Sequence, residues 1–200
     1  NDQVRAVAAA LEDRLDERVE PAFIELTEPL VHEVLEDIAP EADAVTVVPL
    51  SLFAAGHVKN DIPLFVQHAR QTYPDVDFHY GANLGARPEM IDIVADRLSA
   101  AATGMDADPA TDDVAVVFVG RGSSDPDANA EAYRLARFVW EGRDYARVEP
   151  AFIGITEPRV GPTLEAVRRH DPDGVIVHPY MLGEGVLTRR VRDIAAEFDG

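Results

Sequence analysis

The sequence predicts an α/β protein built from two tandem flavodoxin-like units, each with a parallel sheet between layers of helices. Strand-like and helix-like segments alternate along the whole chain of 200 residues, which is typical of a parallel α/β sheet. The strand-like segments are unbroken apolar runs, as expected where helices cover both faces of a sheet. The chain also contains an internal duplication, so the same unit is expected twice.

Each strand-like run is rich in Val, Ile, Phe or Ala and is followed by a helix-like pattern. Strands are expected at residues 22–26, 44–50, 76–81, 114–120, 151–155 and 174–180. Helices are expected at about residues 2–18, 28–38, 58–72, 87–101, 128–143, 159–170 and 186–198. Ligands of open α/β sheets bind at the carboxyl ends of the strands, so the loops that follow these strands form the candidate functional edge.

The duplication is clearest in two ten-residue segments. EPAFIELTEP begins at Glu20 and EPAFIGITEP begins at Glu149, so eight of ten positions agree at an offset of 149 − 20 = 129. The likeness continues in residues 45–58 and 174–187, where each segment has a strand, a proline near its end and a glycine before the next helix. Agreement at this level indicates two homologous halves.

The repeat also predicts the domain boundaries. The N-terminal half should span residues 1–102 and the C-terminal half residues 114–200, joined by a polar linker at residues 103–113. Alignment of the halves indicates that the first lacks an opening strand and the second lacks a last strand and helix. We therefore expect a strand and loop of about 15 residues before Asn1, if the missing piece mirrors its repeat.

Composition excludes several classes of protein. The chain has no cysteine, which excludes disulfides and thiolate metal sites. No apolar run approaches the roughly 20 residues of a membrane span and no signal peptide is visible, so a cytoplasmic protein is expected. The formal net charge of −19 argues against a basic nucleic-acid-binding face. Acid excess with a single lysine predicts a halophilic archaeal source, whose salt screens the self-repulsion; an ordinary acidic bacterial protein is the alternative.

His57 is the first candidate for chemistry. It lies in FAAGHVKNDIP, residues 53–63, between an expected strand and an expected helix. A neutral imidazole at this edge can bind a metal or accept a proton near neutral pH, but a histidine at a helix start can also simply bond to local backbone. The second half keeps the glycine of this turn, Gly185, and has Val186 in place of the histidine. The turn therefore does not need histidine to fold, which favours a chemical role for His57.

Two carboxylates, Glu25 and Glu28, follow the strand expected at residues 22–26. Either could bind a metal or take up a proton. Glu28 opens a helix, where an acidic residue is favourable anyway, and the second half has Glu157 at the matching place. A structural role that Glu28 and Glu157 share is therefore as open as a chemical role for Glu28.

The turn GRGSSDPDANAE, residues 120–131, is a glycine-rich connection from a strand to a helix. It could hold an anion with its backbone N–H groups, or it could be a tight turn with Ser or Asp as the helix N-cap. It matches no common nucleotide-binding motif.

Together, VVPLSLFAAGHVKNDIP, EPAFIELTEP and the GRGSSDPDANAE turn resemble the class II chelatases. Within that family the resemblance is to the long, duplicated enzymes that insert Co2+ into sirohydrochlorin in anaerobic cobalamin biosynthesis. The most specific piece is L-F-x-x-G-H-V-x-x-D-I-P, and the resemblance covers nearly the whole chain. It implies a lyase with two flavodoxin-like halves that face a cleft for a tetrapyrrole.

The resemblance also implies a two-histidine site in the first half. One histidine is His57; the other belongs to an H-G-S turn expected before Asn1, because the second half has R-G-S (121–123) at the matching place. The family also places a glutamate here, for which Glu28 is the best match and Glu25 the next. The expected catalytic residues are His57 and Glu28, and the expected metal ligands are His57, Glu28 and Glu25.

Metal insertion removes two pyrrole N–H protons and delivers a divalent cation, and imidazole and carboxylate groups suit both steps. The expected metal substrate is Co2+, with Fe2+ or Ni2+ as alternatives, and no organic cofactor is expected. Because the tetrapyrrole carries many carboxylates, we expect Lys59, Arg87, Arg121 and Ser123 to bind it.

The expected partners are sirohydrochlorin and a divalent metal ion, without nucleic acid or membrane, in a monomer or homodimer. Three other functions stay open: a ferrochelatase or nickel chelatase, a tetrapyrrole or metal carrier without catalysis, and a flavodoxin-like nucleotide or flavin binder.

Overall fold

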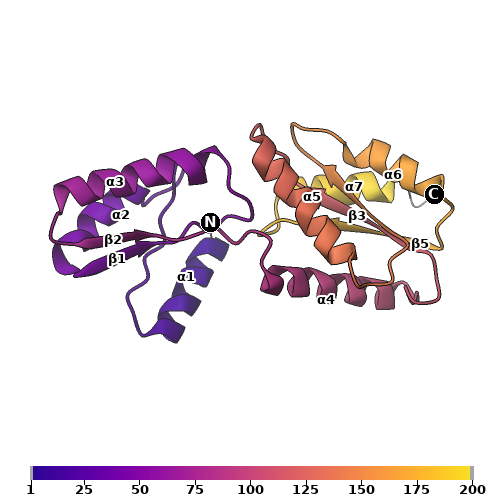
Figure 1. The fold of residues 1–200 in the computed structure, drawn as a ribbon, viewed down its shortest axis with the longest axis horizontal. Coiled ribbons are helices and arrows are strands. Elements are labelled where there is room, and N and C mark those ends of the chain that lie inside the picture. Colours follow the sequence, from indigo (N-terminus) through magenta and orange to yellow (C-terminus); the bar gives the residue numbers. More distant parts are fainter. Residues whose placement is uncertain (1, 199–200) are drawn as a thin grey trace. The chain divides into compact units, whose positions relative to one another are not determined.

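The computed structural model describes residues 2–198 of the chain, and Figure 1 shows its helices and strands. The chain folds into two compact units, one ending at Asn83 and the other beginning at Leu84. Each unit contains a parallel sheet with helices packed on it, so the predicted α/β class is confirmed. None of the helices in the described part of the chain is long and apolar enough to cross a membrane.

The first unit has a two-stranded parallel sheet. Its elements are α1 (Asp2–Leu15), α2 (Val31–Ile38), η1 (Ala39–Glu41), β1 (Ala44–Val47), η2 (His57–Asp61), α3 (Ile62–Thr72) and β2 (Asp77–Tyr80). Helices α2 and α3 pack together, and α3 packs on β2. Figure 1 shows α2 and α3 on one side of this sheet and α1 on the other.

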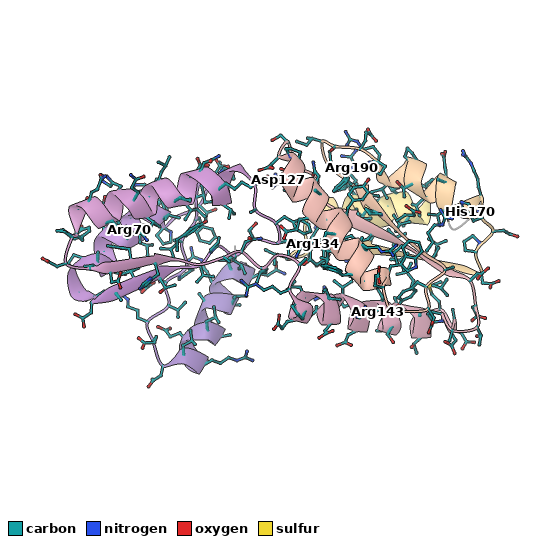
Figure 2. The ribbon with its side chains drawn as sticks, viewed as in Figure 1. Arg70, Asp127, Arg134, Arg143, His170 and Arg190 are labelled. Atoms are coloured by element: carbon teal, nitrogen blue, oxygen red, sulfur yellow. The ribbon has the colours of Figure 1, made fainter. Side chains whose placement is uncertain are left out.

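Apolar side chains from both strands and two helices form the core of this unit. Val45 and Phe78, which lie opposite each other in the sheet, are buried with Leu35 of α2 and Val66 of α3 in one cluster. Arg70 of α3, labelled in Figure 2, donates from Nε to the carbonyl of Phe78 at 3.1 Å. The helix that follows His57 is therefore fixed to the sheet by packing and by a hydrogen bond.

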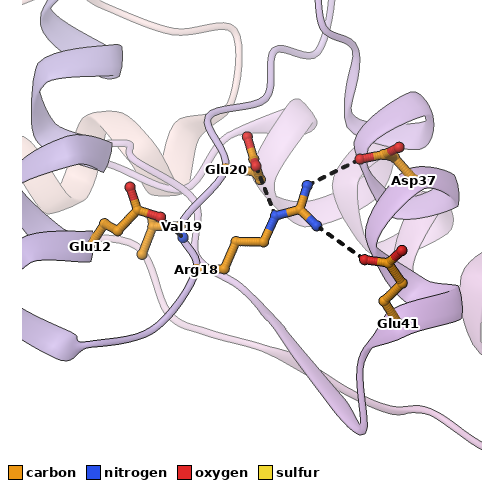
Figure 3. A network of polar contacts seen from close by, with 6 residues as sticks. All are labelled: Glu12, Arg18, Val19, Glu20, Asp37 and Glu41. Atoms are coloured by element: carbon orange, nitrogen blue, oxygen red, sulfur yellow. Dashed lines mark hydrogen bonds and ion pairs between the residues drawn. The ribbon is translucent and has the colours of Figure 1, made fainter.

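The guanidinium of Arg18 ties the segment after α1 to the end of α2 (Figure 3). Its Nε pairs with Glu20 at 2.9 Å. Its terminal nitrogens pair with Asp37 at 3.2 Å and with Glu41 at 4.0 Å. Exposed ion pairs contribute little to stability one by one; these three share one cation and link the segment before residues 22–26 to α2 and η1.

The second unit has a three-stranded sheet with helices on both faces. Its elements are α4 (Pro88–Gly104), β3 (Val114–Gly120), α5 (Pro126–Trp140), β4 (Arg147–Phe152), α6 (Val160–Arg168), β5 (Gly174–Pro179) and α7 (Val186–Ala196). The parallel strands lie in the order β4-β3-β5, and every residue of the central strand β3 is buried. The sequence predicted this burial, because a continuous apolar run is typical of a strand that helices cover on both faces.

Residues 22–26 do not form the predicted strand. Only an isolated parallel bridge forms there, between Phe23 and Leu30. The matching residues of the second unit are 151–155, of which only Ala151 and Phe152 belong to β4 and pair with β3. The strand predicted at 151–155 therefore begins and ends earlier, as Arg147–Phe152. Within the described residues up to 83, no strand corresponds to β3, and β1 pairs with β2 alone. Residues 22 and 23, the counterparts of the end of β4, therefore have no neighbour to form a ladder with, whereas residues 24–26, like 153–155, lie outside a strand in spite of their strand-like composition.

The compact units divide at a different place from the sequence repeats. The first half was expected to reach residue 102, but α4, with its buried Leu98, packs on α5 and β5 of the second unit. The expected linker, residues 103–113, connects α4 to β3. Its last residue, Asp113, donates its N–H to Asp173 at 2.8 Å. The sequence repeat assigns α4 to the first half because of its place in the chain. In the structure α4 belongs to the second compact unit, because its apolar face is buried there.

The duplication extends to the backbone of both halves. The N–H of Phe23 donates to the carbonyl of Pro29 at 2.9 Å, and that of Phe152 donates to Pro158 at 2.8 Å. The peptide bonds before Pro29 and Pro158 are both cis. The two TEP turns are therefore closed in the same way, which gives a structural use for the segment that contains Glu28 and Glu157.

His178, near the end of β5, is a buried histidine whose charged form is disfavoured. Its ring lies near that of Phe118, with the two centroids 5.8 Å apart. Burial, with a smaller effect of the positive charge of Arg97, lowers the pKa of His178 from 6.5 to about 4. Between these values the unfolded chain binds a proton that the folded chain does not, so the free energy of unfolding should fall as the pH drops below about 6.5.

Replacement of His178 by Gln should flatten this pH dependence. Between neutral pH and pH ~4, we expect the parent protein to lose up to about 3 kcal/mol more unfolding free energy than His178→Gln. Urea unfolding at constant salt measures both curves, and His170→Gln, at an exposed position labelled in Figure 2, is the matched control. Parallel curves for the parent and His178→Gln would contradict the assignment.

Candidate functional site

The candidate site of the first unit is built on the loop at residues 48–56, between β1 and η2. Strand β1 ends at Val47, and Pro49, two residues later, has no N–H to offer to a ladder. The carbonyl of Val47 accepts a hydrogen bond from the N–H of Gly81 at 2.9 Å, so β1 and β2 end together. The loop therefore begins at the carboxyl edge of the sheet, where open α/β folds bind ligands.

Residues at the end of β2 hold this loop from the side. The hydroxyl of Tyr80 donates to the carbonyl of Val58 at 2.7 Å, and the amide of Asn83 donates to the carbonyl of Leu52 at 3.2 Å. Burial raises the pKa of Tyr80, so its hydroxyl keeps its proton and remains a donor. The backbone is thus fixed on both sides of His57.

His57 opens a π-helical turn, η2, that runs directly into α3. The N–H of Ile62 donates to the carbonyl of His57, five residues back. Pro63 lies in the first turn of α3, where its missing N–H costs nothing. π-Helical turns occur frequently at functional sites, and this one brings the side chains of His57 and Asp61 together.

The imidazole of His57 lies between two carboxylates. Its Nδ1 is 2.7 Å from Oδ2 of Asp61, which is a hydrogen-bonding distance. Its Nε2 is 4.0 Å from Oε1 of Glu25. The side chain of His57 is 56% exposed, that of Glu25 64% and that of Asp61 46%, so these three residues, called the His57 cluster below, are open to solvent.

The His57 cluster leaves one nitrogen and one carboxylate available to a cation. Asp61 occupies Nδ1, whereas Nε2 and the carboxylate of Glu25 are too far apart to bond to each other. No three His, Asp or Glu side chains of residues 2–198 form a ready-made metal cage. One imidazole and one carboxylate suit a divalent transition metal, and the small number of protein ligands leaves its other positions open.

The structure brings Glu25, rather than Glu28, close to His57. Glu28 is exposed, and its backbone carbonyl accepts a hydrogen bond from Arg5 at 2.7 Å. Between the two glutamates the chain turns at Leu26, which adopts a left-handed φ of 64°. Glu25 is therefore the better placed of the two predicted carboxylates on distance, and the catalytic role of Glu28 stays a prediction.

The predicted substrate-binding residues belong to both units. Lys59 lies in η2, two residues after His57. Arg87 directly precedes α4 and is exposed, and Arg121 is exposed where β3 ends. Arg87 and Arg121 stand at an end of a helix or strand, as expected for residues of a functional edge, whereas Lys59 lies within η2. The roles of all three in substrate binding stay predictions.

The glycine-rich turn at residues 120–131 is closed by its own side chains. Asp125 is the N-cap of α5, and its carboxylate accepts the N–H of Asp127 at 2.9 Å. The hydroxyl of Ser123 accepts the N–H of Asp125 at 3.0 Å, and the N–H of Ser123 donates to Asn129 at 2.9 Å. These bonds fit the interpretation of a capped tight turn, and the substrate role of Ser123 stays a prediction.

Asp61 is the member of the His57 cluster that the sequence analysis missed. Its signal was the spacing, because residues four apart at a helix start lie on one face. It stood in the sequence analysis only as the aspartate of the L-F-x-x-G-H-V-x-x-D-I-P motif, without a role of its own.

The second unit replaces every member of the His57 cluster. At the repeat offset, the glutamate, histidine and aspartate positions hold Gly154, Val186 and Arg190. The N–H of Gly154 donates to the carbonyl of Arg121 at 2.7 Å, and a Cβ at this glycine would lie 2.3 Å from that oxygen. The second unit therefore has no room for a side chain at the glutamate position, and this combination of groups belongs to the first unit.

Comparison with known proteins identifies relatives along nearly the whole chain. The CbiX family model matches residues 1–101 and 115–199, the two segments of the repeat. The sirohydrochlorin cobaltochelatase of Priestia megaterium is 35% identical over 181 residues, which are 90% of this chain and 58% of the relative. The sirohydrochlorin ferrochelatase of the same organism is 29% identical over 194 residues, 96% of this chain and 71% of the relative. The chain thus spans little more than half the length of the first relative.

Solved structures with the same fold include SirB from Bacillus subtilis with Fe3+, at a TM-score of 0.84 and 27% identity, which covers 100% of this chain and 79% of that one. SirB from Bacillus subtilis subspecies spizizenii in complex with cobalt has a TM-score of 0.75 and 26% identity, covering 100% of this chain and 77% of that one. The likeness therefore extends across both units.

Gly154→Ala should destabilise the second unit. The added methyl group would meet the carbonyl oxygen of Arg121 at 2.3 Å and disturb the hydrogen bond that Gly154 donates to it, so we expect a loss of about 1–3 kcal/mol. Thermal or urea unfolding measures the loss. Gly161→Ala, where a Cβ meets nothing within 4 Å, is the matched control. If Gly154→Ala is as stable as the parent, the close approach of these two backbone segments is wrong.

Proposed function

Because the chain belongs to the CbiX family of class II chelatases, we propose that it inserts Co2+ into sirohydrochlorin. Relatives that match 90% and 96% of the chain bear the names of sirohydrochlorin chelatases, which supports this substrate. The structural observation that carries the proposal is the His57 cluster, an exposed imidazole whose Nε2 lies 4.0 Å from the carboxylate of Glu25.

In this proposal the metal substrate is first held by Nε2 of His57 and by Glu25. A neutral imidazole and a carboxylate are suitable donors for Co2+. The chain has no cysteine, so no thiolate competes for the ion and holds it against transfer. Since the cluster is open to solvent, the remaining coordination positions are accessible to the nitrogens of an incoming macrocycle.

Insertion exchanges one divalent cation for two protons. The pyrrole nitrogens of the free macrocycle carry these protons, and each must leave as the metal–nitrogen bonds form. As the ion passes to the macrocycle, the imidazole of His57 and the carboxylate of Glu25 lose it and can accept the two protons that leave the pyrrole nitrogens. Both side chains are more than half exposed, so the protons can pass to water.

Cobalt is the proposed metal, and Fe2+ and Ni2+ are its competitors. Two relatives named for cobalt are 35% identical to this chain, over 181 and 77 residues, and two named for iron are 29% and 30% identical. This difference favours cobalt. Nitrogen and oxygen donors accept all three ions, so the metal present at the site also depends on supply.

The macrocycle is proposed to be bound by cationic groups that offset the charge of the chain. A protein with a net charge of −19 repels a polycarboxylate at long range. Lys59, two residues after His57 in η2, is the cation proposed to bind the macrocycle beside the His57 cluster. The substrate roles of Arg87, Arg121 and Ser123 stay predictions. Screening by salt weakens the long-range repulsion, whereas contacts at short range are affected less.

His57→Ala should abolish metallation of sirohydrochlorin, and Glu25→Gln should lower kcat by about 10–100-fold because a metal ligand and proton acceptor is lost. The assay is the change in the visible spectrum of sirohydrochlorin on addition of Co2+, corrected for the reaction without protein. Glu28→Gln is the matched control on the same turn, and we expect a smaller effect from it.

Full activity of His57→Ala would overturn the site. A larger loss in Glu28→Gln than in Glu25→Gln would restore Glu28 as the catalytic carboxylate. Stoichiometric binding of Co2+ or sirohydrochlorin without turnover would favour a carrier over an enzyme. Equal concentrations of Co2+, Fe2+ and Ni2+ in one anaerobic reaction would test the metal, and cobalt should dominate the product.

A further inference from the structure

The hydrogen bond between Asp61 and His57 determines which ring nitrogen carries a proton. Oδ2 of Asp61 lies 2.7 Å from Nδ1 of His57. An ionised carboxylate can only accept hydrogen bonds, so the proton of this bond belongs to Nδ1. The neutral ring must then present a lone pair on Nε2, which is the nitrogen on the side of Glu25.

Asp61 does not serve the role that its position in the chain suggests. It occupies the N-cap position of α3, but its side chain makes no capping hydrogen bond there. Ordinary capping aspartates accept an N–H of the first helical turn. The carboxylate is instead turned toward the histidine that opens the preceding π turn.

Both partners of this hydrogen bond are held in place by their neighbours. The carbonyl of Val58, the residue after His57, accepts the hydroxyl of Tyr80 at 2.7 Å. Ile62, the residue after Asp61, is buried in the core of the first unit. The π turn between them is therefore fixed at both ends, so the 2.7 Å contact does not depend on two freely rotating segments.

We propose that Asp61 is a positioning residue that holds His57 in the Nδ1–H tautomer, so that the Nε2 lone pair is available to a divalent cation. The inference rests on the proposed function for its cation. Asp61 acts through His57 and does not bind the metal itself, since its carboxylate is bound to the nitrogen on the far side of the ring. Carboxylates that orient metal-binding histidines in this way raise their basicity.

The duplication supports a link between the two residues. At the repeat offset, the histidine position holds Val186 and the aspartate position holds Arg190. The next residue is buried and apolar in both units, as Ile62 and as Val191. Helix packing at this point therefore does not need an aspartate, and the acidic residue occurs in the unit that has the histidine.

The tautomer can be measured without any metal or tetrapyrrole. Two-dimensional NMR can correlate the imidazole nitrogens with the carbon-bound protons of the ring. At mildly alkaline pH, where imidazole is neutral, these spectra distinguish a protonated from an unprotonated Nε2. We expect an unprotonated Nε2 for His57 in the parent protein and a mixture of tautomers in Asp61→Ala. Asp61→Asn, which retains an acceptor oxygen, should keep most of the parent tautomer.

A second histidine–aspartate pair in the same unit supplies the control. Nε2 of His79 lies 3.1 Å from Oδ2 of Asp77 in β2, and both side chains are exposed. Asp77→Ala should alter the signals of His79 and leave both the His57 tautomer and Co2+ binding unchanged. If the loss of any surface carboxylate were enough to change Co2+ binding, Asp77→Ala would change it as Asp61→Ala does.

Binding of Co2+ alone, followed by calorimetry, completes the test. We expect Asp61→Ala to weaken binding by about 10–100-fold, Asp61→Asn to weaken it less, and the same order in kcat. A protonated Nε2 in the parent, or an unchanged tautomer and Co2+ affinity in Asp61→Ala, would overturn the inference. If the tautomer and affinity change as expected but the parent does not metallate sirohydrochlorin, the proposed function fails and the positioning role stands.

Discussion

The parallel pairing of β1 with β2 is the constraint on which the site of the first unit depends. It ends both strands at the same edge, with Gly81 still bonded to the carbonyl of Val47. The residues that follow β2 can therefore reach sideways to the loop that follows β1. Without this pairing, Tyr80 would not meet the carbonyl of Val58, and the π turn that carries His57 and Asp61 would lose its support.

The duplication separates what the fold requires from what the chemistry requires. Both halves keep the TEP turn with its cis proline and the bond that closes it. The groups that could handle a metal ion differ: Gly154 faces the carbonyl of Arg121 so closely that no side chain fits, whereas the first half has Glu25 at this position. The same backbone thus carries the His57 cluster in one unit, while in the other the positions of His57 and Asp61 hold the exposed residues Val186 and Arg190.

The sequence predicted those elements whose signal is local. The apolar run of β3 showed a strand buried on both faces, and the glycine turn around His57 pointed to a functional loop because its repeat lacks the histidine. Residues 22–26 and 151–155 look equally strand-like, but β4 includes only Ala151 and Phe152 of these residues. A strand exists only where a neighbour pairs with it, and composition does not report the neighbour. Likewise, the sequence of α4 predicts that one face of this helix is buried, but it does not show which of the two sheets the face packs on.

The site was predictable to the level of residue type but not of geometry. His57 and a carboxylate from the TEP segment were both expected. The choice between Glu25 and Glu28 depends on the turn at Leu26, whose left-handed backbone no pattern predicts. Asp61 was part of the quoted motif but received no role, because a sequence motif does not show that its side chain is bonded to Nδ1 of His57.

The central claim is that a divalent cation enters at Nε2 of His57 beside Glu25. Crystals of the protein soaked with Co2+ and measured at the cobalt absorption edge would test it most directly. We predict an anomalous peak within bonding distance of Nε2, with Glu25 as a second protein ligand and Asp61 still bonded to Nδ1. A peak at Glu28 or in the second unit, with none at His57, would contradict the claim.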